Sequence, residues 1–161
     1  MKAAVLTVSD GVSAGVREDT SGDVLEELLR DEGYSVARTV VPDDADVIAA
    51  AIGSFGDAGV ALVLTTGGTG FAPRDVTPEA TRAVIDREAP GIAEAIRADA
   101  LARTPHALLS RGIAGLRGAT LVVNFPGSPG GCRDGFEIVR PALRHGLELA
   151  AGETTTQHRQ T

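Results

Sequence analysis

A glycine-rich segment, Thr65–Gly70, holds the residues best suited to binding a charged ligand. It directly follows an apolar run, Val60–Leu64, whose composition is typical of a buried strand. Glycines let the backbone adopt positive φ and approach a ligand closely, so that its amides face an anion. The segment lacks the lysine of a P-loop and the spacing of a dinucleotide-binding loop, and the alternative is a flexible turn. We favour an anion-binding loop formed by Thr66, Gly67, Gly68, Thr69 and Gly70.

Asp75 is the first of two aspartates that could complete such a site. It follows the glycine-rich segment, beside Arg74 and just before the helix that Pro78 is expected to begin. Thr77 is the better N-cap for that helix, because proline is favoured at the first helical position after a cap. Asp75 is therefore left for a metal ion or an electrostatic role, and Arg74 is a candidate for binding substrate.

The second aspartate, Asp43, follows an expected strand, Ser35–Val41. In open α/β sheets, ligands gather at the carboxyl ends of strands, where this turn and the glycine-rich segment would converge. Asp43 is therefore the second candidate for a catalytic residue. The alternative is that Asp43, or Asp44 beside it, only caps the next helix.

Two further loops combine polar side chains with glycine. Ser110 and Arg111 offer a hydroxyl and a guanidinium on a glycine-flanked turn, Ser110–Gly115. The segment Asn124–Gly131 leads into the last expected helix, whose first amides are free to face an anion. Either loop could be simple turn chemistry. Both nevertheless add candidates for substrate binding, which are Ser110, Arg111, Asn124, Pro126, Gly127 and Ser128.

Charge and composition exclude several other kinds of site. The net charge of −7 argues against a broad nucleic-acid-binding face, and an aromatic content of 3% is too low for a base-stacking platform. The single Cys132 excludes an intrachain disulfide and a multi-cysteine metal site. The longest apolar run, Val47–Ile52, is far shorter than the ~20 residues that cross a membrane. We expect a cytoplasmic protein that binds neither nucleic acid nor membrane.

Short apolar segments alternate with helical ones along the chain. This alternation predicts an α/β fold, a three-layer α/β/α sandwich with a mostly parallel central sheet. We predict a single domain over residues 1–152 and a polar, disordered tail over 153–161. The expected strands are Ala3–Val8, Ser35–Val41, Val60–Leu64 and Thr120–Val123. The expected helices run from Thr20-Ser21 to Gly33, from Asp43-Asp44 past Ile52, from Thr77-Pro78 toward Glu88, and over Ile92–Ala102 and Cys132–Leu149.

The order of these motifs resembles the molybdopterin adenylyltransferase (MogA/MoaB-type) family of molybdenum-cofactor biosynthesis. The resemblance covers nearly the whole chain, and Arg74–Thr81 is one of its specific strings. The other matching motifs are Thr7–Asp10, Arg17–Gly22, Pro42-Asp43, Thr65–Gly70, Ser110–Gly115 and Asn124–Pro129. The resemblance implies a three-layer α/β/α domain that forms a homotrimer or a larger assembly of trimers, with a contact to the molybdate-inserting enzyme as a further expectation.

The activity that the resemblance implies is transfer of AMP from ATP to the terminal phosphate of molybdopterin, with magnesium. On the family pattern, Asp43 and Asp75 become the acidic pair that holds Mg²⁺ against the triphosphate. The loop Gly67–Gly70 would cradle the molybdopterin phosphate, Ser110 would bind substrate, and Asn124–Ser128 would line the same pocket. Local positive charge would come from Arg74, Arg111 and Arg133.

The sequence departs from the family pattern at one position, and two other functions are alternatives to adenylyl transfer. Gly130 stands where family members often carry lysine, so Arg133 would have to compensate for the missing charge. One other function is a binding module that holds molybdopterin without adenylylating it. The other is a nucleotide hydrolase, by analogy with the competence-damage proteins. Only the adenylyltransferase needs Asp43 and Asp75 as a working pair.

Overall fold

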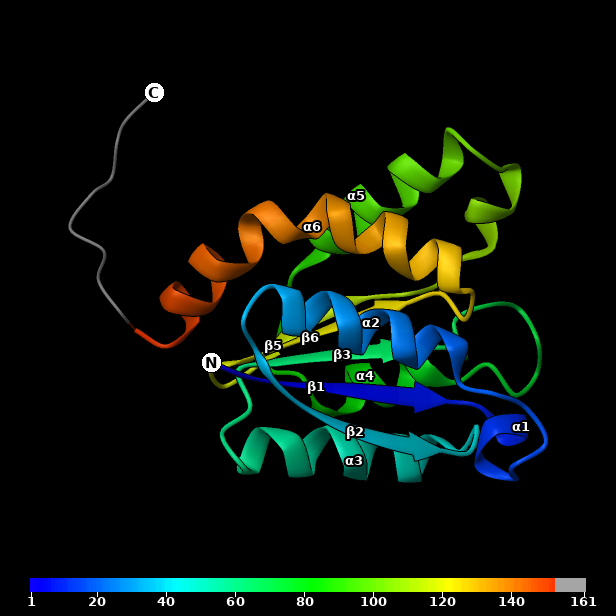
Figure 1. Ribbon diagram of the computed structural model, residues 1–161, viewed down its shortest axis with the longest axis horizontal. Helices are drawn as coiled ribbons and strands as arrows, with labels where there is room; N and C mark the ends of the chain where they lie inside the picture. The colour runs from blue at the N-terminus through cyan, green and yellow to red at the C-terminus, as the bar shows by residue number, and fades with distance from the viewer. Residues whose placement is uncertain (153–161) are drawn as a thin grey trace.

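A six-stranded sheet forms the centre of the protein (Figure 1). The computed structural model describes residues 1–152, and the tail predicted over 153–161 lies outside the described residues. The strands are β1 (Lys2–Val8), β2 (Ser35–Val41), β3 (Leu62–Thr66), β4 (Arg87–Glu88), β5 (Ala114–Arg117) and β6 (Thr120–Phe125). Their order in the sheet is β2-β1-β3-β6-β5-β4. Strands β1, β2, β3 and β6 run parallel, and β5 pairs antiparallel with both β6 and β4.

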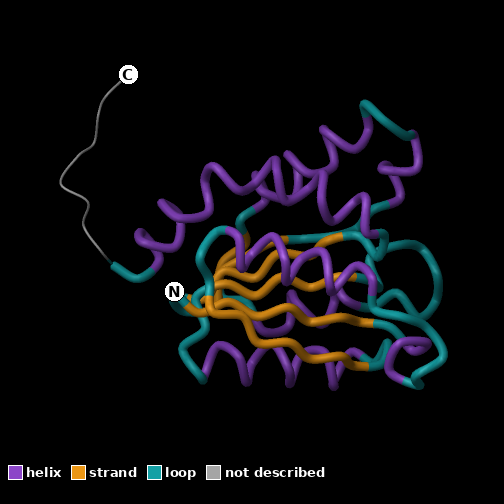
Figure 2. The backbone as a smooth tube through the Cα atoms, viewed as in Figure 1, coloured by secondary structure: helices purple, strands orange, loops and turns teal. Residues whose placement is uncertain are grey.

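Helices cover both faces of the sheet, which lies as the middle layer between them (Figure 2). The helices are α1 (Asp10–Ser13), α2 (Thr20–Asp31), α3 (Ala45–Asp57), α4 (Thr77–Val84), α5 (Pro90–Leu101) and α6 (Pro129–Ala150), with the 3-10 helix η1 (Pro105–Leu109). Helices α2, α5 and α6 lie on one face, and α3 and α4 lie on the other (Figure 1). The predicted three-layer α/β/α fold with a mostly parallel sheet is confirmed.

Each face of the sheet has its own hydrophobic core, because alternate strand residues point to opposite sides. Val5 of β1 packs in one core with Leu25 of α2 and Phe136 of α6. Leu6, the next residue of β1, belongs to the other core with Ile48 of α3. Every residue of β3 is buried, which explains why its sequence lacks polar alternation.

Side-chain caps fix where the helices near the strand ends begin. Asp19 caps α2 by accepting a hydrogen bond from the amide of Gly22 at 3.0 Å. Ser128 caps α6 in the same way. Asp44 caps α3, so this role falls to Asp44 and leaves the carboxylate of Asp43 for other contacts.

The helix that contains Thr77 differs from the prediction at both ends. Thr77 is the first residue of α4 and not its N-cap, because its hydroxyl donates to the carbonyl of Gly67 at 2.9 Å. The helix ends at Val84 instead of continuing toward Glu88. Residues 87–88 form β4, whose pairing with β5 draws the chain out of the helical conformation.

Two segments predicted as loops contribute residues to regular elements. Helix α6 begins at Pro129 and not at Cys132, because the cap at Ser128 allows proline at the first helical position. Gly115, predicted to lie in a turn, belongs to β5 and pairs with Glu88. The single turns α1 and η1 were not predicted, since each is too short to show helical periodicity.

The carboxyl ends of β1, β2, β3 and β6 meet at one edge of the sheet. The strand order reverses between β1 and β3, because β2 lies on one side of β1 and β3 lies on the other. Ligands of open α/β proteins bind at such a switch point. We therefore expect a ligand site among the turns that follow these four strands. Within residues 1–152, no helix combines the length and the apolar character that a bilayer crossing requires.

Candidate functional site

A cleft of about 200 Å³ opens at these four strand ends. Both predicted aspartates, Asp43 and Asp75, line it, together with Gly67 and Gly68 of the glycine-rich loop. Gly127, from the turn after β6, lines it as well. The lining also includes Thr7, Ser9, Arg17, Asp19, Ser21 and Thr66. The structure thus brings together residues that are far apart in the sequence and that the sequence analysis placed at one site.

Asp43 is held at the cleft through a reciprocal pair of hydrogen bonds with Asp10. Its Oδ2 accepts the amide of Asp10 at 2.8 Å, and its own amide donates to Asp10 Oδ1 at 3.0 Å. Its Oδ1 lies 3.3 Å from the point where a Cβ on Gly68 would stand. Within residues 1–152 this Oδ1 accepts no hydrogen bond, so it is available to a ligand.

Asp75 lies against the same glycine-rich loop and lines the same cleft. Its Oδ2 accepts the amide of Ala72 at 2.9 Å and lies 2.9 Å from the point where a Cβ on Gly70 would stand. Gly68 and Gly70 are two residues apart, and two residues of chain span at most about 7 Å. The carboxylates of Asp43 and Asp75 therefore contact the same loop, and both residues line the cleft.

The glycine-rich loop has the conformation that its sequence predicts. Gly67 and Gly68 have φ angles of +95° and +66°, which side chains disfavour. A Cβ on Gly67 would lie 2.3 Å from the carbonyl oxygen of Val8, so the loop passes too close to β1 for a side chain. The amides of Gly68, Thr69 and Gly70 donate to no acceptor within residues 1–152. Three successive free amides form the kind of concavity that binds anions.

Arg111, predicted to bind substrate, does not line the cleft and contacts the loop from outside it. Its Nε donates to the carbonyl of Gly70 at 2.7 Å, and its Nη2 donates to the carbonyl of Asp75 at 2.5 Å. Its Nη1 pairs with Glu79 on α4, and this hydrogen bond lowers the pKa of the Glu79 carboxyl. Arg111 thereby joins both ends of the turn that carries Asp75.

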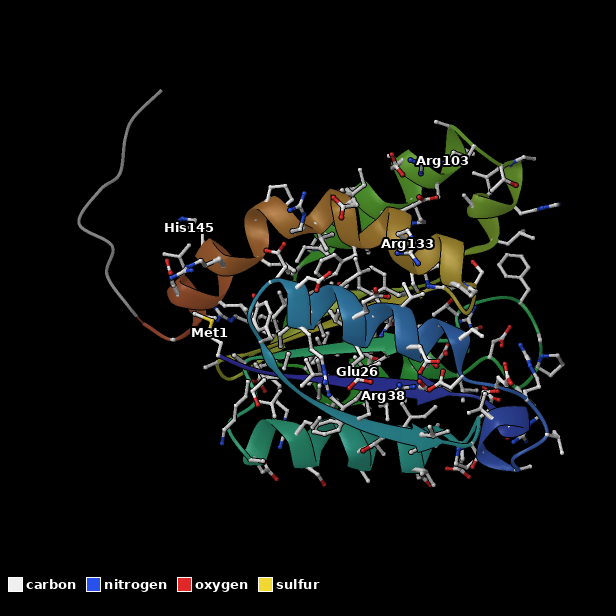
Figure 3. The ribbon with its side chains drawn as sticks, in the orientation of Figure 1. Met1, Glu26, Arg38, Arg103, Arg133 and His145 are labelled. Carbon is white, nitrogen blue, oxygen red and sulfur yellow. The ribbon has the colours of Figure 1, made fainter. Side chains whose placement is uncertain are left out.

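Arg74, the second predicted cation, also holds the framework of the cleft. It donates to both carboxylate oxygens of Asp10, from Nε at 2.5 Å and from Nη2 at 3.0 Å. This hydrogen bonding lowers the pKa of Asp10. Because Asp10 in turn holds Asp43, Arg74 acts on the position of that aspartate. Arg133 lies on α6, outside the residues that line the cleft (Figure 3).

Asn124 lies inside the protein, with only 4% of its surface exposed. Its Nδ2 donates to the hydroxyls of Thr65 at 2.9 Å and Thr81 at 3.0 Å. Its Oδ1 accepts the amide of Ile113 at 3.2 Å. The side chain therefore ties β6 to β3, to α4 and to the segment before β5.

The remaining predicted residues lie beside the cleft and are not among its lining residues. The carbonyl of Pro126 accepts the hydroxyl of Thr66 at 2.7 Å. Ser128 caps α6, and the hydroxyl of Ser110 accepts the amide of Gly112 at 3.4 Å. The residues outside the lining are Thr69, Gly70, Ser110, Pro126 and Ser128.

The buried position of Asn124 predicts a stability effect. We expect Asn124→Ala to lower the free energy of unfolding by about 2–3 kcal/mol, because buried polar groups lose their partner. Urea denaturation followed by circular dichroism measures this change. As a control, Ser54→Ala on the exposed side of α3 should change stability by less than about 0.5 kcal/mol. Equal stability of the two variants would contradict the structural role of Asn124.

A comparison with protein families identifies the chain. The family model described as "Probable molybdopterin binding domain" matches residues 4–145, which include all the residues that line the cleft. The chain belongs to this family.

Individual relatives support this family assignment. The molybdopterin adenylyltransferase of Helicobacter pylori strain J99 is 40% identical over 92% of this chain and 86% of that protein. The crystal structure of the molybdopterin biosynthesis enzyme MoaB from Thermus thermophilus has a TM-score of 0.87 and 48% identity, over 94% of this chain and 96% of that one. Cinnamon of Drosophila melanogaster is 38% identical over 94% of this chain, which spans only 26% of cinnamon's length.

The donor set of this molybdopterin-binding domain fits a magnesium ion shared with a substrate. Mg²⁺ in proteins is commonly bound through one or two carboxylates together with phosphate oxygens and waters. Asp43 and Asp75 supply two carboxylates, and each keeps its Oδ1 free of hydrogen bonds within residues 1–152. The described residues contain no cluster of three or more His, Cys, Asp or Glu side chains that could hold a metal alone. The site therefore suits an ion that arrives with phosphate.

The lining residues between Thr7 and Ser21 were not among the predicted site residues, and Ser9, Arg17 and Asp19 are three of them. These three follow β1, whose carboxyl end adjoins the switch point. Their motifs, Thr7–Asp10 and Arg17–Gly22, carried part of the family resemblance. Their place directly after the first strand was the signal that would have selected them.

Cys132, the single cysteine of the chain, is buried and close to Thr66. Burial raises the pKa of the Cys132 thiol to about 11. At pH 8 this pKa lies about three units above the pH, so only about one molecule in 10³ carries the thiolate. We therefore expect no reaction of the native protein with a thiol-specific disulfide reagent at pH 8 within minutes. The chain should react once guanidinium unfolds it, and rapid labelling of the native protein would contradict the burial.

Proposed function

We propose that the chain is a molybdopterin adenylyltransferase, which transfers AMP from ATP to the terminal phosphate of molybdopterin with magnesium. The observation that carries the proposal is that Asp43, Asp75 and the loop glycines line one cleft. Membership of the molybdopterin-binding family supports the pterin substrate. The name of the Helicobacter relative, which matches most of this chain, supports the reaction.

The reaction needs charge compensation more than proton transfer. A phosphate monoester has a second pKa of about 6, so near pH 7 it is mostly dianionic and needs no general base. It must approach another anion, and two unit charges 4 Å apart repel by about 4 kcal/mol at an effective dielectric of about 20. A site that holds both phosphates in line and offsets their charge removes the main obstacle.

The residues of the cleft divide this task. Asp43 and Asp75 would hold magnesium, which supplies positive charge between the two phosphate groups when bound. The free amide of Gly68, a residue of the cleft lining, would donate to the molybdopterin phosphate, and the free amides of Thr69 and Gly70 lie next to it in the chain. Arg17 is a cationic side chain in the lining and is suited to an anionic group of either substrate.

Several predicted substrate-binding residues take positioning roles in this proposal. Arg111 holds the Asp75 turn, Arg74 holds Asp10, and Asn124 ties β6 to β3. Gly127 keeps its predicted place in the lining. The direct contacts with substrate then come chiefly from the glycine-rich loop and from the residues after β1.

The proposed assembly follows the family resemblance. A homotrimer, or a larger assembly of trimers, and a contact with the molybdate-inserting enzyme remain part of the proposal. An apolar groove of about 430 Å³ between α5 and α6 is the kind of surface that such an assembly would cover. Its lining includes Pro90, Ile92, Ala95, Ile138 and Ala142.

The experiment that tests the function is a turnover assay with purified molybdopterin, magnesium and ATP labelled at the α-phosphate. Labelled AMP that becomes attached to the pterin supports adenylyl transfer. Free labelled AMP formed without pterin would instead indicate a nucleotide hydrolase. Unchanged ATP beside tightly bound pterin would indicate a binding module without the activity.

A further inference from the structure

The cleft has an excess of acidic side chains for a site that would bind two anionic substrates. Glu18, Asp19, Asp43 and Asp75 line it, against the single cation Arg17 among its lining residues. A magnesium ion held by Asp43 and Asp75 would offset that pair. The carboxylate of Asp19 lies outside the pair, and left uncompensated it would repel phosphate groups.

Arg38 of β2 contacts this carboxylate from beneath α2. Its Nη2 lies 2.6 Å from Asp19 Oδ2. Its Nη1 lies 2.6 Å from Asp23 Oδ1 and 2.8 Å from Glu26 Oε2, both on α2. Figure 3 shows the labelled side chains of Arg38 and Glu26 between α2 and β2. One guanidinium therefore joins the edge strand to the first turns of the helix.

The contact to Asp19 is shielded from solvent, unlike an ordinary surface ion pair. The side chain of Asp19 is 11% exposed and that of Arg38 is 26% exposed, so salt screens this pair less than an exposed one. Burial alone would lower the pKa of Arg38, but its hydrogen bonds to the three carboxylates raise it. Arg38 therefore carries its positive charge near pH 7.

The other hydrogen bonds of Asp19 make its position specific. Its Oδ2 also accepts the hydroxyl of Thr7 at 2.7 Å, and its Oδ1 accepts the amide of Gly22 at 3.0 Å. A Cβ on Gly22 would lie 2.3 Å from Asp19 Oδ2 and 2.6 Å from the Thr7 hydroxyl. With Arg38 in place, both carboxylate oxygens of Asp19 accept hydrogen bonds within the protein, which fixes the orientation of the carboxylate.

We propose that Arg38 is a positioning residue for the adenylyl-transfer site. It offsets part of the charge of Asp19 and fixes the wall of the cleft, so that a polyphosphate can bind. The inference rests on the proposed function for its biological meaning. The effect of Arg38 on the affinity for Mg-ATP can be measured separately from turnover. Lysine would keep the charge but could not contact Asp19 and the helix carboxylates through a planar fork.

The test is the dissociation constant of Mg-ATP, measured by titration calorimetry for the full chain. We expect Arg38→Leu to weaken binding on the order of tenfold, because an unpaired carboxylate then faces the phosphates. Arg38→Lys should fall between this variant and the wild type. Arg30→Leu is the matched control, since Arg30 pairs with Glu26 on the same helix and does not line the cleft.

The double variant Arg38→Leu with Asp19→Asn separates charge from structure. Asparagine can still accept the Gly22 amide but carries no charge, so the double variant should recover most of the affinity that Arg38→Leu loses. A double variant as weak as Arg38→Leu, or equal effects of Arg38→Leu and Arg30→Leu, would overturn the proposal. Circular dichroism confirms that each variant is folded. A wild type that binds Mg-ATP without adenylylating molybdopterin would count against the proposed function alone.

Discussion

Asp75→Asn is expected to reduce the rate of AMP transfer by about 10³-fold while the protein remains folded. The reason is the loss of one of the two carboxylates that would hold the ion between the phosphates, where the repulsion amounts to about 4 kcal/mol. Asparagine can still accept the amide of Ala72, which the carboxylate Oδ2 accepts at 2.9 Å. The turn should therefore persist, and molybdopterin binding with it.

The measurements for this variant are single-turnover kinetics with labelled ATP, molybdopterin affinity and thermal unfolding. Asp31→Asn is the matched control, because it removes the same charge from an exposed position at the end of α2. We expect this control to transfer AMP at the wild-type rate. Undiminished turnover of Asp75→Asn would refute the metal role of Asp75.

Gly67→Ala is expected to damage both the fold and the activity. The methyl group would lie 2.3 Å from the carbonyl oxygen of Val8, which belongs to the backbone of β1 and has little room to move. The φ of +95° adds strain of its own. We expect a loss of about 2–4 kcal/mol in the free energy of unfolding and a loss of transfer activity that persists where the variant is folded.

Gly15→Ala is the control that isolates the cost of positive φ. Gly15 has a φ of +74°, and a Cβ there would meet no atom within 4 Å. This substitution should cost about 1 kcal/mol and leave turnover unchanged. If urea denaturation gave the same loss for Gly15→Ala and Gly67→Ala, the close approach of the loop to β1 would have no energetic consequence.

Much of the fold could be predicted from local patterns. The strand β3 shows an apolar run because helices cover both of its faces, and Asp44, which caps α3, is a polar residue of the type that begins helices. The end of α4 was not predictable in this way. Helical periodicity continues past Val84, and only the pairing of Glu88 with Gly115, from a distant part of the chain, ends it.

The candidate site was predictable to the extent that it depends on strand ends. Asp43, Asp75 and the loop glycines follow strands, and parallel strands bring their carboxyl ends together. Arg111 and Asn124 were predicted to contact substrate, whereas their side chains make hydrogen bonds within the protein. A polar residue in a loop sequence looks the same in both roles, because its partners come from other elements.

Arg38 was not predictable as part of the site. It stands in the middle of an edge strand, where a charged residue is an ordinary protection of the edge. Its contact with Asp19 exists only because α2 packs back over β1 and β2. Interactions of this kind require the tertiary structure.

The most direct test of the account is a crystal structure with Mn²⁺ in place of Mg²⁺ and a nonhydrolysable ATP analogue, recorded with the anomalous signal of manganese. We expect one anomalous peak in the cleft, from a manganese ion bonded to the carboxylates of Asp43 and Asp75, with the triphosphate beside the glycine-rich loop. A nucleotide bound elsewhere, or a manganese ion that contacts neither aspartate, would contradict it.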